Sequence, residues 1–138
     1  MREVSNGSHL VTYLVAKMNE KYPNHQLKKF SIQRLMYLFE VKSKKDFDYK
    51  LYNYGPYSSM IETFLEVAES LGFIEIMWQP NDSYFVKLKN NNFADGFLEE
   101  KEKQIIDEIV ESYGKYTDKE LFEITTVIYS KKNFAPIK

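Results

Sequence analysis

One central stretch of the sequence constrains the fold most, because a helical pattern runs directly into two strand-like patterns. Residues 58–71 carry apolar side chains at helical spacing, start with two serines suited to cap a helix, and end at Gly72. Residues 73–78 and 84–89 read as two strands joined by the turn-forming sequence Gln-Pro-Asn-Asp. A helix followed at once by a β-hairpin is the local pattern of a winged-helix unit.

Helices are predicted on both sides of this unit. Helical spacing of apolar residues predicts one helix over residues 8–22, with Ser8 as its cap, and a second from the cap Ser31 to the polar cluster 42–46. A third helix is predicted over residues 99–114, and a fourth begins at the Thr117–Glu120 capping box. We therefore expect residues 1–138 to form a single α+β domain that is mostly helical. Its core is winged-helix-like, with a small antiparallel β-hairpin or a three-stranded sheet.

A further strand is predicted over residues 47–54. Phe47, Tyr49 and Leu51 alternate there with polar or less apolar residues, as in a strand with one buried face. Gly55 and Pro56 end this strand in our interpretation. Gly55 permits a backbone conformation closed to other residues, and Pro56 fixes φ before the next helix, so we expect both to be structural.

The composition excludes several classes of chemistry. The 138 residues include no cysteine, which excludes disulfide scaffolds, thiolate zinc sites, iron–sulfur clusters and cysteine nucleophiles. The two histidines, His9 and His25, are expected to be solvent-exposed. We predict no catalytic residue, no metal site and no cofactor. The chain also has no apolar run of the ~18 to 20 residues that span a membrane and no leader-like pattern, so we expect a cytoplasmic monomer or homodimer without a membrane partner.

The charge is distributed unevenly, although the formal net charge is only −1. Residues 1–55 carry ten Lys and Arg against five Asp and Glu, whereas residues 56–138 carry nine against fifteen. The helix over residues 57–71 has three Glu and no Lys or Arg, so its approach to a nucleic acid would be repulsive. The alternative nucleic-acid face is basic and consists of Lys28, Lys29, Arg34, Lys42, Lys44 and Lys45.

Aromatic residues gather around the Gly-Pro pair and suggest a surface for a protein partner. Tyrosine is favoured at binding hot spots, and alternation places Tyr52 opposite the buried face of the predicted strand. The proposed surface combines aromatic anchors and a methionine with two carboxylates: Tyr52, Tyr54, Tyr57, Met60, Glu62 and Glu66.

Several motifs resemble one known family, over about residues 10–130. The sequence Ile-Gln-Arg-Leu-Met-Tyr-Leu at 32–38 resembles the L-x-K-L-L-Y-F/L helix of the Panacea domain, the SocA-like antitoxin and phage-associated protein family. Residues 54–58 match the Y-G-P-Y-S form found in its bacterial and archaeal relatives, and residues 71–74 resemble its L-G-x-I element. Residues 120–126 resemble its E-L-x-x-x-T-H helix, with Thr126 in place of the family's His and without the Trp that usually follows.

This resemblance implies an α-rich fold with a β-hairpin and no enzymatic activity. It implies a protein-binding antitoxin or adaptor of a toxin–antitoxin or mobile-element system, whose partner is a toxin or a protease system. The alternative function is a winged-helix-like DNA-binding transcriptional regulator that would use the basic residues around Lys28 to Lys45.

Overall fold

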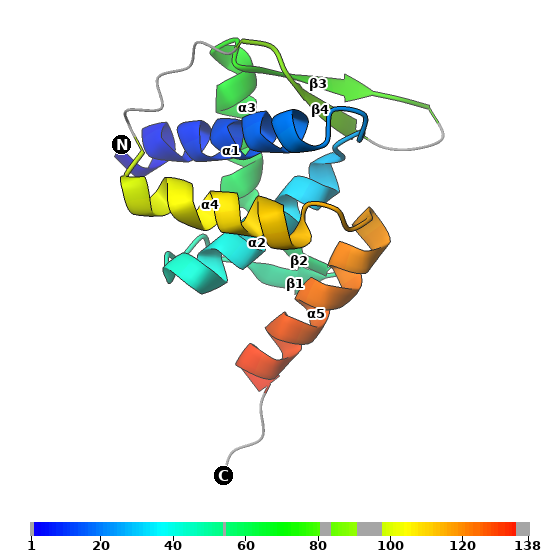
Figure 1. The fold of residues 1–138 in the computed structure, drawn as a ribbon. Coiled ribbons are helices and arrows are strands. Elements are labelled where there is room, and N and C mark those ends of the chain that lie inside the picture. The colour runs from blue at the N-terminus through cyan, green and yellow to red at the C-terminus, as the bar shows by residue number, and fades with distance from the viewer. Residues whose placement is uncertain (1, 54, 81–83, 91–97, 135–138) are drawn as a thin grey trace.

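The computed structural model describes residues 2–53, 55–80, 84–90 and 98–134, with the side chains of 6–132 in these ranges. These residues form a mixed α+β domain (Figure 1). Its five helices and four strands, in chain order, are α1 (Arg2–Lys21), α2 (Lys29–Ser43), β1 (Lys50–Tyr52), β2 (Gly55–Tyr57), α3 (Ser59–Ser70), β3 (Ile74–Trp78), β4 (Tyr84–Leu88), α4 (Glu100–Tyr113) and α5 (Asp118–Phe134).

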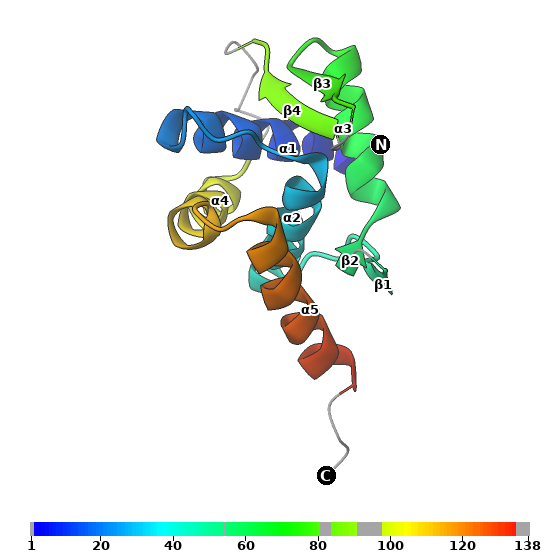
Figure 2. The same cartoon turned by 90° about the vertical axis from the view of Figure 1, so that its right-hand side faces the viewer.

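Helix α2 lies at the centre of the domain. Figure 2 shows it between α4 on one side and the β1–β2 hairpin on the other, and it also packs against α1, α3 and α5. Nine consecutive residues, Ser31 to Phe39, are buried. A helix that is buried on every side has no solvent face for a polar stripe, which explains why polar Gln33 and Arg34 also lie in the interior.

The strands form two separate antiparallel hairpins, β1–β2 and β3–β4, within the described residues. The α3–β3–β4 order predicted from the sequence is confirmed, whereas a single three-stranded sheet is not formed. On one edge of the second hairpin, Val86 donates its backbone N–H to Leu27 just before α2, at 2.8 Å. On the other edge, the Ile76 N–H donates to the Glu69 carboxylate of α3 at 3.1 Å.

The predicted helix starts are wrong at two serines. Helix α1 begins at Arg2, so Ser8 is an interior residue and fully buried. Helix α2 begins at Lys29, and Ser31 lies in its first turn, where its hydroxyl donates to Asp118. In both cases the tertiary contacts extend the helix beyond the first residue that propensity favours as a cap.

The strand predicted over residues 47–54 is shorter than expected. Phe47 and Tyr49 are buried as predicted, but Leu51 is exposed and only Lys50–Tyr52 pair as a strand. The backbone N–H of Phe47 donates instead to the Glu40 carboxylate at 2.8 Å. The Gly-Pro pair does not end strand structure, because Gly55–Tyr57 forms β2 and pairs with β1.

A buried amide-to-backbone pairing joins α2 to the start of α3. The Gln33 side chain accepts from the Ser58 N–H at 3.0 Å and donates to the Ser58 carbonyl at 2.9 Å. The Ser58 hydroxyl donates to the Phe47 carbonyl at 2.6 Å and caps α3 by accepting from Met60 and Ile61. Tyr49 donates its hydroxyl to the Gln33 carbonyl at 2.6 Å. The backbone N–H and carbonyl of Ser58 therefore both have their partner on α2, and its hydroxyl has partners in the preceding loop and in α3.

Replacing Gln33 by Leu should lower the free energy of unfolding by about 2 kcal/mol, because the buried Ser58 N–H would lose the Gln33 oxygen to which it donates. Chemical denaturation measures this loss. Gln104→Leu, on the exposed side of α4, is the matched control and should change stability by less than about 0.5 kcal/mol. Equal effects of the two substitutions would contradict the role of the pairing.

Gly55 is predicted to tolerate alanine less well than Gly72. Both residues have positive φ, 93° and 82°, so both substitutions strain the backbone. A Cβ at Gly55 would lie 3.0 Å from the Phe122 ring, whereas a Cβ at Gly72 meets nothing within 4 Å. Gly55→Ala should therefore lower the melting temperature more than Gly72→Ala, and the reverse order would contradict this account.

Candidate functional site

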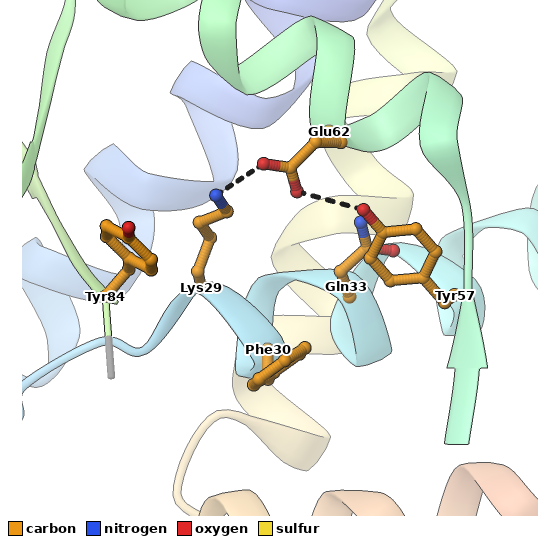
Figure 3. A pocket seen from close by; sticks show the side chains of 6 residues that line it. All are labelled: Lys29, Phe30, Gln33, Tyr57, Glu62 and Tyr84. Atoms are coloured by element: carbon orange, nitrogen blue, oxygen red, sulfur yellow. Dashed lines mark hydrogen bonds and ion pairs between the residues drawn. The ribbon is translucent and has the colours of Figure 1, made fainter. Parts of the chain in front are cut away.

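A groove lined by aromatic side chains lies across the N-terminal end of α2. Its deeper part holds a cavity of about 190 Å³ (Figure 3). A shallower hollow beside it shares Phe30 and Tyr57 and therefore continues the same surface. We call the two together the aromatic groove, which consists of Lys29, Phe30, Gln33, Tyr52, Asn53, Tyr57, Glu62 and Tyr84.

Three stretches that are distant in the sequence supply these side chains, and the middle one contains both the β1–β2 hairpin and the start of α3. The first turn of α2 contributes Lys29, Phe30 and Gln33, the β1–β2 hairpin contributes Tyr52 and Tyr57, α3 contributes Glu62, and β4 contributes Tyr84. The Gln33–Ser58 pairing holds α2 against the β2–α3 junction. It therefore also sets the distance between the first turn of α2 and the side chains that flank Ser58.

At each end of the groove an aromatic ring packs against a neighbouring ring, edge to face at one end and at a tilt at the other. The rings of Tyr52 and Tyr57 are perpendicular, with centroids 5.6 Å apart. The rings of Trp78 and Tyr84 are 5.1 Å apart, and these residues are cross-strand partners beside the hairpin turn. Trp78, Tyr52 and Tyr84 are nonetheless 58%, 54% and 45% exposed. This is a large aromatic area for the surface of a small domain.

An ion pair lies in the middle of the groove. The Lys29 ammonium pairs with one oxygen of Glu62 and lies 4.8 Å from the centroid of the Tyr84 ring. The Tyr57 hydroxyl donates to the other Glu62 oxygen at 3.4 Å. Burial raises the pKa of the Tyr57 hydroxyl, and the negative charges of Glu62 and Glu66 raise it further. The phenol therefore stays protonated at neutral pH and remains a donor to Glu62.

The structure brings together part of the predicted partner surface. Tyr52 is exposed, Tyr57 and Glu62 are half-buried in the groove, and Glu66 is exposed on α3. Met60 packs instead against the hydrophobic core, because it lies on the inward side of the first turn of α3. Tyr54 lies outside the described residues.

Sequence reasoning did not assign Phe30, Gln33, Tyr84 or the neighbouring Trp78 to this surface. Trp78 and Tyr84 are the last and first residues of the two hairpin strands. Cross-strand pairing across the predicted turn would have placed both on one face of the hairpin. No local signal connects either residue to α2, since that contact depends on the tertiary structure.

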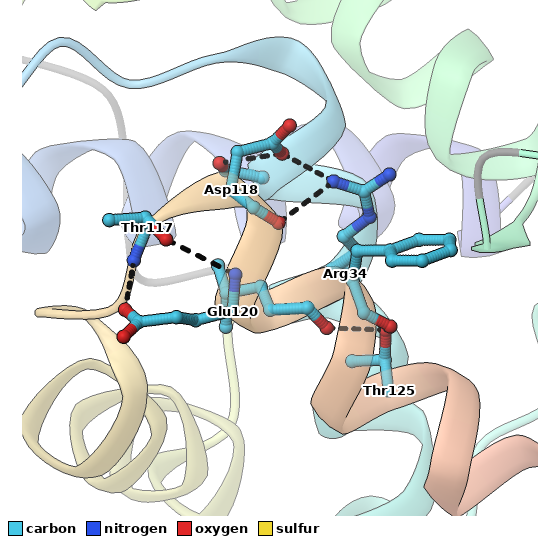
Figure 4. Close-up of polar contacts among 8 residues, drawn as sticks. Arg34, Thr117, Asp118, Glu120 and Thr125 are labelled. Carbon is cyan, nitrogen blue, oxygen red and sulfur yellow. Dashed lines mark hydrogen bonds and ion pairs between the residues drawn. The ribbon is translucent and has the colours of Figure 1, made fainter.

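The predicted basic face is divided into separate groups. The Arg34 guanidinium is buried and bound to both the carboxylate and the backbone carbonyl of Asp118 at the start of α5 (Figure 4). Lys29 is paired with Glu62, and Lys45 is paired with Glu102 of α4 at 3.0 Å. Lys42 and Lys44 are exposed, but Lys44 follows Lys28 by sixteen residues, which corresponds to about 24 Å along a helix. The six residues therefore do not form one continuous face.

The predicted exposure of the histidines is wrong for His9. Because α1 begins before residue 8, His9 lies inside the helix, is buried, and contacts the Phe73 ring at a centroid distance of 5.4 Å. His25 is half-buried beside Tyr22. Among the residues that the structure describes, no three His, Asp or Glu side chains are grouped as a metal site would need. None of the helices in the described ranges is long and apolar enough to cross a membrane.

Thr126, which stands where the Panacea motif that the sequence resembles has a His, faces the β1–β2 hairpin from α5. Its hydroxyl oxygen is buried, and a Cβ built on Gly55 would lie 3.4 Å from it. No protein-family model, curated protein or solved structure matches the chain. Membership of the Panacea domain family therefore stays a prediction, which rests on the sequence motifs alone.

Replacing Asp118 by Ala should lower the free energy of unfolding by about 3 kcal/mol, because it leaves the Arg34 guanidinium buried without its counter-charge. Thermal and chemical denaturation measure the change. Glu123→Ala, on an exposed position of the same helix, is the control and should have little effect. A stable Asp118→Ala variant would instead mean that Arg34 is able to reach solvent.

Proposed function

We propose that this protein is a non-enzymatic, cytoplasmic protein-binding module, an antitoxin or adaptor of a toxin–antitoxin or mobile-element system, and that its partner docks on the aromatic groove. The observation that carries the proposal is the groove itself. Exposed tyrosine and tryptophan side chains line or flank a hollow that contains a half-buried ion pair. Aromatic anchors around a partly desolvated charge are typical of the energetic centre of protein interfaces.

The charge near the groove supports a protein partner over a nucleic acid. Helix α3, which borders the groove, contains Glu62, Glu66 and Glu69 and no Lys or Arg. Lys29, the lysine that lines the groove, is already paired with Glu62. A phosphate backbone would therefore meet little uncompensated positive charge here, and counterion release would contribute little to its binding.

The absence of enzymatic activity is part of the proposal and is supported by the composition. The chain has no cysteine, which excludes a Cys–His pair, and only two histidines could serve as the base of a Ser–His pair. The motifs that resemble the Panacea domain support the same class of function.

Tyr52→Ala should weaken the complex with a protein partner by about 30-fold, because truncating an aromatic hot spot costs about 2 kcal/mol. The experiment co-expresses the full chain with the product of the gene next to its own and measures affinity after co-purification. Leu71→Ala is the matched control, since Leu71 is also 54% exposed but lies just after the far end of α3. Both variants should keep the wild-type melting temperature within a few degrees.

Unchanged affinity of the Tyr52→Ala variant would contradict docking on the groove. A complex that forms with a double-stranded DNA fragment, weakens steeply with salt and needs no protein would contradict the proposed function. It would favour the alternative of a DNA-binding regulator.

A further inference from the structure

Lys29 occupies a position that does not favour its own helix. It is the first residue of α2, follows Lys28 as the N-cap residue, and no acidic residue lies in the first turn. Positive charge at a helix N-terminus is unfavourable because it opposes the helix dipole. The N-cap also makes no side-chain cap hydrogen bond. Any stabilisation of the fold by the Lys29 ammonium therefore comes from its contacts in the groove, which are the Glu62 carboxylate and the Tyr84 ring.

Glu62 is a carboxylate that needs a cation. Its side chain is only 21% exposed, and its two oxygens face the Lys29 ammonium and the Tyr57 hydroxyl. Lys29 meets it with a point charge at the end of a flexible stem. The rest of the space beside Glu62 is the cavity of about 190 Å³, bounded by Phe30, Tyr57 and Tyr84 (Figure 3).

A carboxylate next to several aromatic rings is the chemistry that recognises a cationic side chain. Aromatic faces attract cations, arginine more often than lysine, and a planar guanidinium matches a carboxylate with two parallel hydrogen bonds. The ammonium of Lys29 over the Tyr84 ring shows that this site already holds a cation of the chain itself.

The two charged side chains that line the cavity balance each other, and the charge just beside it on α3 is negative. Lys29 balances Glu62, and Arg34, whose guanidinium lies 5.6 Å from the Phe30 ring centroid, is balanced by Asp118. Glu66 is exposed one turn further along α3 and acts electrostatically on Tyr57 in the groove. On the side of the cavity formed by α3, where Glu62 and Glu66 lie, an incoming cation is therefore favoured over an incoming anion.

We infer that the groove binds an arginine side chain of the protein partner, and that Lys29 is an internal competitor which the arginine displaces from Glu62. This inference rests on the proposed function and names the chemistry of its contact. The guanidinium bonds Glu62 and lies among the rings of Phe30, Tyr57 and Tyr84, while the Lys29 ammonium moves toward solvent. Removing Lys29 then strengthens binding, and removing the charge of Glu62 weakens it.

The test uses the full-length protein and two small probes, N-acetyl-arginine methylamide and its neutral isostere N-acetyl-citrulline methylamide. Two-dimensional amide NMR should show saturable shifts at residues of the groove with the arginine probe and weaker or no shifts with citrulline. Lys29→Met should lower the dissociation constant of the arginine probe about 5- to 10-fold, and Glu62→Gln should raise it by a similar factor.

Lys17→Met is the matched control. Lys17 also pairs with a carboxylate, Glu20, and also lies over a tyrosine ring, at 5.4 Å from the Tyr13 centroid, but outside the groove. Its replacement should leave binding of the probe unchanged. The comparison of arginine with citrulline on the wild-type protein needs no variant and decides the inference even if a substitution unfolds the chain.

Equal binding of the two probes would overturn the inference, and so would weaker binding by Lys29→Met, which would make Lys29 a direct ligand contact. A partner complex that is insensitive to Glu62→Gln would overturn this inference and leave the proposed function standing. Probe binding without any protein complex would contradict the proposed function and leave the arginine site in place.

Discussion

The pairing of the Gln33 amide with the backbone of Ser58 determines how the rest of the domain is arranged. It consists of two hydrogen bonds in the interior, where a polar group without a hydrogen-bond partner is most unfavourable. One residue before Ser58 lies Tyr57, and four residues after it lies Glu62, so the same contact places an aromatic wall and a carboxylate beside the first turn of α2. The hydrophobic core could tolerate other packings of similar volume, but these four polar atoms have one matching arrangement.

The burial of α2 decides where the domain can interact with other molecules. Its middle is surrounded by four helices and a hairpin, so its accessible residues are at its two ends. At the C-terminal end, Lys42 and Lys44 are solvated. At the N-terminal end, two hairpins and α3 lie around the first turn. Their side chains leave a hollow there instead of a flat surface (Figure 3). A concave surface with several aromatic walls is better suited to enclose a partner's side chain than a convex helix face.

The sequence predicted the elements better than their contacts. The α3–β3–β4 unit, the Thr117–Glu120 capping box and the burial of Phe47 and Tyr49 follow from local periodicity and turn chemistry, and all are confirmed. The predicted helix starts at Ser8 and Ser31 are wrong, because residues suited to capping also fit buried helix positions. The Ser31 hydroxyl finds its partner there in the Asp118 carboxylate.

The candidate site was predicted only in part, for a related reason. Tyr52, Tyr57 and Glu62 lie within eleven residues of one another in the sequence, and local reasoning grouped them. Phe30 and Tyr84 join them only through tertiary packing. Lys29 and Arg34 were grouped by charge alone, although each has a carboxylate partner more than thirty residues away. Charge along a sequence does not reveal such pairing.

Because the aromatic groove is assembled from three stretches that are distant in the sequence, it exists only in the native state, and ligand binding is thermodynamically linked to folding. A partner that binds the folded chain and not the unfolded chain raises the free energy of unfolding by about 2.7 kcal/mol at a free concentration of one hundred times its dissociation constant. Degradation of a small domain proceeds through its opened or unfolded forms. If a partner occupies the groove as proposed, the lifetime of this protein in a cell depends on how much of that partner is present, so that the amount of the protein follows that of the molecule it binds.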